Sequence, residues 1–176
     1  MNSIELLRLQ LMQMHDEIVH KTLADLTIEQ LNWRPNAEAN NIGFSVWHAL
    51  RVWDFDHARM GAGEELYERE HWPKRFGFET AGKGMRGYGI GSGFSAQDIA
   101  GMHFVPVVLA TYADALWART QQYLDGTGEA DLDREFLHPW RPEVTLTPAK
   151  VLVHTITHTA MHIGEAAYVR GLMPRG

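Results

Sequence analysis

The chain of 176 residues contains no cysteine. This absence excludes disulfide bonds, metal sites built on thiolates and catalysis by a cysteine nucleophile. Positive charge is also scarce, since 16 lysines and arginines stand against 22 aspartates and glutamates, a formal net charge of −6. Binding to phosphate backbones requires a basic face. The sequence shows no such face, so we expect no nucleic-acid partner.

Long apolar runs are missing as well. No run approaches the ~20 consecutive apolar residues that a membrane-spanning helix needs. The first residues, MNSIELLRLQ, lack the basic and apolar regions of a signal peptide. Together these absences favour a cytoplasmic protein that has no membrane partner.

What the chain does contain is helical periodicity. Apolar residues recur three or four positions apart in the first segment, and the second is apolar on most sides, as expected of a buried helix. The four segments are residues 3–24, 42–60, 95–124 and 147–170. Thr147 and Pro148 open the last one, and Gly171 is expected to end it. No strand-like alternation appears, so the sequence predicts one all-α domain, a four-helix bundle without a sheet.

Two features interrupt this regularity. Residues 77–93 hold seven glycines, a density that predicts a loop. Within them, GKGMRG matches the spacing of a dinucleotide-binding turn, but no strand precedes it, so the loop interpretation is favoured. Pro106 falls inside the third helical segment and should kink it or separate its first turns.

Three histidines share one stripe of the last helical segment. His154, His158 and His162 are spaced i, i+4, i+8 on a largely apolar helix. A single buried histidine is usually structural, whereas two imidazoles one turn apart can converge on a metal ion. Positions eight apart lie about 12 Å apart along a helix axis. At most one neighbouring pair can therefore bind one ion, and a further ligand must come from elsewhere.

His48 is the leading candidate for that further ligand. It lies in the middle of the most apolar segment, and helix bundles build metal sites from facing helices. His57 lies about 180° around the same helix, so at most one of the two can face the site. His103 is a reserve candidate that is weakened by its proximity to Pro106.

The choice of pair within the last segment stays open on physical grounds. His158 and His162 share their stripe with Glu165, and Gly164 would let a neighbouring helix or ligand approach closely. For His154, a supporting hydrogen bond or a place in a pocket wall is equally compatible with the pattern.

Two coupled sequence patterns resemble a known family. L-N-W-R-P at 31–35 with N-I-G-F-S-V-W-H at 41–48, and H-T-A-M-H-I-G-E at 158–165 with R-G-L at 170–172, are similar to the DinB-like (YfiT-like) metal-dependent four-helix bundles. The similarity covers nearly the whole chain. It implies an up-down-down-up bundle in which His48, His158 and His162 hold one divalent ion. The glycine-rich loop is longer than expected for that family.

Three neutral imidazoles would leave an open position on the ion, which is the catalytic rather than the closed structural arrangement. Zn²⁺ and Ni²⁺ are the expected occupants, because imidazole suits both. Glu165 is a candidate for orienting a ligand imidazole or acting as general base, against the alternative of a salt bridge. Arg51, one turn past His48, is a candidate for binding a substrate carboxylate, against that of an ordinary surface arginine.

The resemblance implies an enzyme that acts on a small molecule. The two activities it suggests are transfer of a low-molecular-weight thiol, as cosubstrate, and metal-assisted hydrolysis; it also suggests a homodimer. The rival hypothesis is a non-catalytic metal-binding or stress-response bundle whose ion is structural. In a third and weaker interpretation, the histidines only pack.

Overall fold

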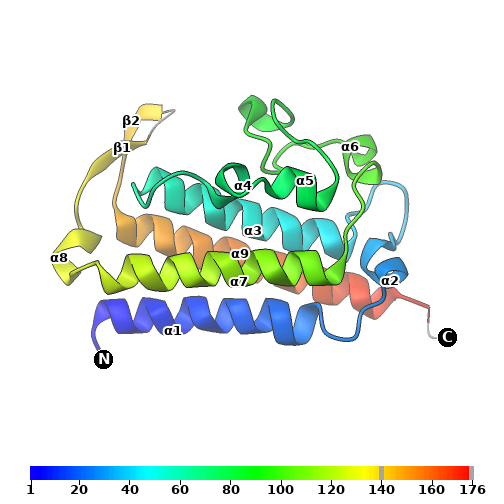
Figure 1. Cartoon of the computed structure of the whole chain (residues 1–176), viewed down its shortest axis with the longest axis horizontal. Coiled ribbons are helices and arrows are strands. Elements are labelled where there is room, and N and C mark those ends of the chain that lie inside the picture. The colour runs from blue at the N-terminus through cyan, green and yellow to red at the C-terminus, as the bar shows by residue number, and fades with distance from the viewer. Residues whose placement is uncertain (139–140, 175–176) are drawn as a thin grey trace.

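The structure is a computed structural model that describes residues 1–138 and 141–174. Its body is a bundle of four long helices: α1 (Ser3–Asp16), α3 (Ile42–Arg59), α7 (Pro106–Asp125) and α9 (Pro148–Leu172). Figure 1 shows α1 and α9 running in one direction, from left to right, and α3 and α7 returning in the other. The predicted all-α bundle with up-down-down-up topology is therefore confirmed.

The helix ends follow the local chemistry of the sequence. The Asn2 side chain accepts a hydrogen bond from the Glu5 N–H at the start of α1, which continues into the π-helix η1 (Glu17–Thr22). The third predicted segment is split as Pro106 suggested, into α6 (Ala96–Ala100) and α7, which starts at the proline. The expected end of the last helix at Gly171 is wrong by one residue, because α9 runs to Leu172.

Short elements surround the bundle. The helical ones are α2 (Ile28–Asn32), α4 (Leu66–Arg69), α5 (Trp72–Phe76), η2 (Met85–Gly87) and α8 (Glu129–Leu132). The expectation of no strand is corrected by an antiparallel hairpin of β1 (Phe136–His138) and β2 (Arg141–Leu146). This hairpin buries little of either face, so its sequence carries no alternation of apolar and polar residues. The glycine-rich segment is a loop, as predicted, apart from the single turn of η2.

The core lies between the helices and includes the buried carboxylate of Asp54. Asp54 of α3 is 0% exposed. It accepts hydrogen bonds from the backbone N–H groups of Leu66 and Tyr67, at 2.9 and 2.8 Å, and pairs with Arg119 of α7 at 2.6 Å. One side chain thus supplies the N-terminal cap of α4 and ties it to α3 and α7. Among the described residues, no helix is both long enough and apolar enough to cross a membrane.

Candidate metal centre

His48, His158 and His162 come together between α3 and α9. One ring nitrogen from each lies within 4.8 Å of the other two. The His48 ring centroid is 4.9 Å from that of His158 and 4.7 Å from that of His162, and the two rings on α9 are 4.5 Å apart. The pair from α9 and the single histidine from α3 are the combination that the family resemblance implied.

Local structure places His48 in this position. The Asn41 side chain accepts a hydrogen bond from the Phe44 N–H at 2.7 Å and thereby starts α3. The Phe44 ring then stacks on the imidazole one turn later, with centroids 5.9 Å apart and planes only 8° from parallel. His48 is 7% exposed, so its ring has little freedom to turn away.

The glycine-rich loop fixes the tautomer of the His48 imidazole. His48 Nδ1 lies 2.5 Å from the carbonyl oxygen of Ile90. A carbonyl only accepts, so Nδ1 carries the hydrogen and Nε2 keeps its lone pair for a metal. A Cβ on Gly91 would lie 2.7 Å from the same Nδ1, so the contact requires glycine at this position. Sequence reasoning found the loop but not this role, because nothing in its composition indicates which carbonyl meets a histidine.

Glu165 orients the His162 imidazole through its Nδ1. Its Oε2 lies 2.8 Å from His162 Nδ1, and Asn40 donates to Oε1 at 2.8 Å. The bond to the His162 ring, followed by that from Asn40, lowers the pKa of Glu165 against the effect of burial. The ionised carboxylate only accepts, so Nδ1 carries the hydrogen, and in the neutral form of the ring Nε2 keeps its lone pair. This arrangement favours the orienting role predicted for Glu165 over a salt bridge to a basic residue.

His158 is held differently. Its Nδ1 is buried and has no hydrogen-bond partner among the described residues. Burial lowers the pKa of His158 to about 3, with the neighbouring His48 and His162 rings adding to the effect, and burial likewise lowers the pKa of His48 to about 4. Neutral imidazole is the form that binds metals. Three imidazoles with two fixed tautomers and one orphaned nitrogen suit a divalent cation.

The other candidate histidines lie outside the triad. His154 Nδ1 is 2.8 Å from Asp56 Oδ2. The His154 side chain also lines a cavity, so both the hydrogen bond and the place in a pocket wall that the sequence left open are present. His57 faces α7, where its Nε2 lies 3.2 Å from Thr120 Oγ1. His103 is exposed. No neighbouring helix approaches Gly164 closely, contrary to one part of the expectation from the sequence, because a Cβ there would meet no described atom within 4 Å.

Arg51 is buried in the bundle. It is 2% exposed, its Nη2 is 2.8 Å from a Glu65 oxygen, and its guanidinium lies 3.7 Å from the centre of the Tyr67 ring. The surface alternative is therefore wrong. Because a substrate would have to displace Glu65 to reach the guanidinium, this position favours a structural role over the predicted binding of a substrate carboxylate.

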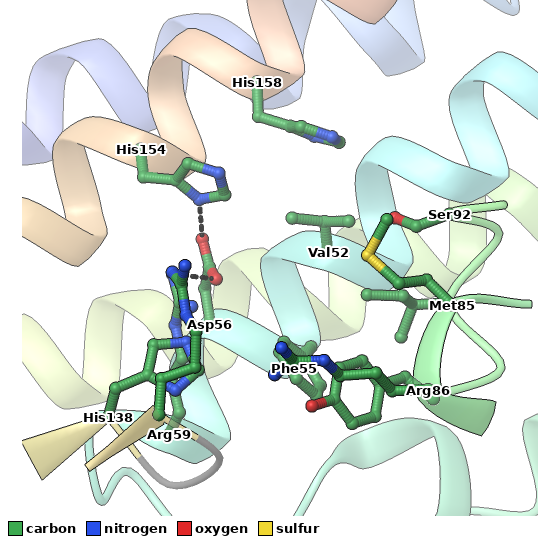
Figure 2. A pocket seen from close by; sticks show the side chains of 13 residues that line it. Val52, Phe55, Asp56, Arg59, Met85, Arg86, Ser92, His138, His154 and His158 are labelled. Atoms are coloured by element: carbon green, nitrogen blue, oxygen red, sulfur yellow. Dashed lines mark hydrogen bonds and ion pairs between the residues drawn. The ribbon is translucent and has the colours of Figure 1, made fainter. Parts of the chain in front are cut away.

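Open space adjoins the three histidines on one side. A cavity of about 350 Å³ lies between α3, the glycine-rich loop, the hairpin and α9, and His158 forms part of its wall. In Figure 2, His154 and His158 project from α9 into this space, opposite Val52 and Met85. A small molecule in the cavity would therefore lie next to the metal centre.

Comparisons with known proteins agree with the fold. A solved structure of a conserved protein from Enterococcus faecalis aligns over 98% of this chain and 97% of its own, with a TM-score of 0.80 and 24% identity, which shows the shared fold. The curated proteins give no match. The family model described as the DinB superfamily matches residues 11–166. The chain therefore belongs to the DinB superfamily.

Proposed function

We propose that this protein is a metal-dependent enzyme that acts on a small molecule at the centre formed by His48, His158 and His162. The observation that carries the proposal is the convergence of three imidazole nitrogens within 4.8 Å of one another beside a cavity. Three protein ligands and an adjoining space are the arrangement typical of catalytic rather than structural sites.

The chain's own residues prepare these nitrogens for an ion. Ile90 and Glu165 hold the Nδ1 hydrogens of His48 and His162, so both rings present Nε2 in a fixed orientation. A divalent ion, Zn²⁺ or Ni²⁺, would lower the pKa of a bound water or thiol into the physiological range. Glu165 is engaged by Asn40 and His162, so we assign it to positioning rather than to proton transfer.

Transfer of a low-molecular-weight thiol and metal-assisted hydrolysis are the two reactions we propose to test. The rival is a non-catalytic bundle with a structural ion. A structural ion is expected to be closed by protein ligands, and the cavity beside His158 favours the enzyme instead. A homodimer and a cytoplasmic location remain predictions from the sequence.

Cobalt substitution tests whether the centre is open. The Co²⁺-loaded protein should change its visible spectrum on addition of azide, and should gain a thiolate-to-cobalt absorption band on addition of 2-mercaptoethanol if it activates thiols. A response to azide alone would point to hydrolysis. A spectrum that changes with neither azide nor 2-mercaptoethanol would indicate a closed structural ion and overturn the proposal.

A further inference from the structure

The cavity beside the metal centre has an unusual charge for this molecule. Three arginines reach it from segments far apart in the sequence: Arg59 on α3, Arg86 in η2 and Arg141 on β2. The one acidic residue among its described lining residues is Asp56. In a chain whose formal net charge is −6, three guanidinium groups against one carboxylate form a local exception.

Asp56 is already occupied by its neighbours. Its Oδ1 pairs with Arg59 Nη2 at 2.7 Å, and its Oδ2 lies 2.8 Å from His154 Nδ1 and accepts from Thr155 Oγ1 at 2.7 Å. Asp56 is 0% exposed, so it anchors α9 to α3 from behind the cavity wall. It balances one of the three positive charges and leaves the wall with a positive surplus.

The pKa of His138 reflects the same excess of positive charge. Burial is the main cause that lowers its pKa, and the charges of Arg59, Arg141 and Arg86 lower it further, while Glu143 opposes them. The three arginines thus act on a common point in the wall, and Glu143 offsets them only in part.

The backbone at Arg86 is a separate indication. Arg86 has a φ of 54°, in the left-handed region, within a loop where Gly84 and Gly87 have φ of 68° and 72°. An arginine in this region is uncommon, and such strain gathers at ligand sites. Glycine would fit this backbone better, so the arginine is kept at this position at a cost in backbone free energy.

We propose that this cavity binds the anionic group, carboxylate or phosphate, of a small molecule whose apolar part rests on Val52, Phe55 and Ile90. Guanidinium groups recognise both anions through paired hydrogen bonds. This identification of the ligand rests on the proposed function. The ligand is then the substrate of the metal centre, because His158 both lines the cavity and belongs to the group of three histidines.

Calorimetric titration of the full-length protein with phenyl phosphate and with phenylacetate tests the proposal, with benzyl alcohol as the neutral probe. Arg86→Gly removes the guanidinium and relieves the backbone, and a urea unfolding curve of each variant separates a loss of binding from a loss of the fold. Arg141→Gln removes a second charge, Arg86→Lys keeps the first, and Arg75→Gln, an exposed arginine outside the wall, is the control. His48→Ala separates anion binding from coordination to a metal.

We expect at least one of the two anions to bind, and benzyl alcohol to bind far more weakly. Arg86→Gly and Arg141→Gln should each weaken binding about tenfold or more. Arg86→Lys, which keeps the charge but loses the paired hydrogen bonds, should weaken binding less than Arg86→Gly does, while Arg75→Gln and His48→Ala retain most of it. Unchanged binding in Arg86→Gly and Arg141→Gln, no binding of either anion, or loss of binding only in His48→Ala would overturn the proposal. A protein that holds no metal but binds the anions through these arginines would refute the proposed function and leave the anion site standing.

Discussion

Gly91 is the position where a single methyl group should damage the metal centre most selectively. Its φ of +101° already favours glycine, and a Cβ there would lie 2.7 Å from His48 Nδ1 and 3.1 Å from Trp47 Cζ3. Trp47 is 0% exposed and cannot yield. In Gly91→Ala the loop must therefore move away, which separates the Ile90 carbonyl from the His48 ring.

Two costs follow, and they can be measured separately. A non-glycine residue in this backbone region costs about 1–3 kcal/mol of folding stability. Loss of the hydrogen bond that orients a ligand histidine typically lowers metal affinity about 10–100-fold, equivalent to about 1.4–2.7 kcal/mol. Gly77→Ala is the matched control, since Gly77 has a φ of +77° but a Cβ there meets nothing within 4 Å.

Competition with a chromogenic chelator measures the affinity for Zn²⁺, and urea unfolding measures the stability. Both variants should lose stability, but only Gly91→Ala should lose metal affinity. Equal metal affinities in Gly91→Ala and Gly77→Ala would refute the role assigned to the loop.

Three further predictions follow from named contacts. Glu165→Gln should keep the fold and weaken metal binding about 10–100-fold, because an amide holds His162 Nδ1–H less strongly than a carboxylate does; an unchanged dissociation constant would contradict this. Asp54→Ala should lose about 3–5 kcal/mol in urea unfolding, since it leaves buried Arg119 without its carboxylate partner and removes the acceptor of the Leu66 and Tyr67 N–H groups. Asp125→Ala, which breaks an exposed pair, should change stability by about 1 kcal/mol or less. Burial lowers the pKa of His57 to about 3, so only the unfolded chain takes up this proton between about pH 6.5 and pH 3. His57 should therefore contribute a loss of stability of about 1.4 kcal/mol per unit of decreasing pH across that window. His57→Asn should show a slope smaller by that amount, and an equal slope would count against the assignment.

The sequence predicted the four helices because their signals are local. Helical apolar spacing and caps such as Thr147 are visible without tertiary information. The break before Pro106 follows from the missing N–H and the ring of the proline. The β-hairpin was missed because its exposed strands bury no continuous face, and an apolar pattern is what sequence reasoning detects.

For the candidate site, the sequence indicated the histidines but not their supports. Spacing limited the last helix to one pair, the apolar setting of His48 made it the leading third ligand, and the resemblance selected His158 and His162. The partner of His48 is a main-chain carbonyl, which every residue possesses, so no sequence pattern indicates it. The burial of Arg51 was not predicted, because its environment depends on Glu65 and Tyr67, which come to lie beside α3 only in the folded chain. The cationic cavity could not be predicted either, because Arg59, Arg86 and Arg141 are far apart in the sequence and meet only in the folded chain.

Elemental analysis of the purified protein beside its His48→Ala and His158→Ala variants, each with a thermal melt followed by circular dichroism, tests the metal centre most directly. We predict one divalent ion per chain in the wild type, and loss of that ion from both variants with the helical fold retained. A wild-type protein that binds no ion after reconstitution with Zn²⁺ or Ni²⁺, or variants that keep a full complement, would contradict the assignment of the three histidines.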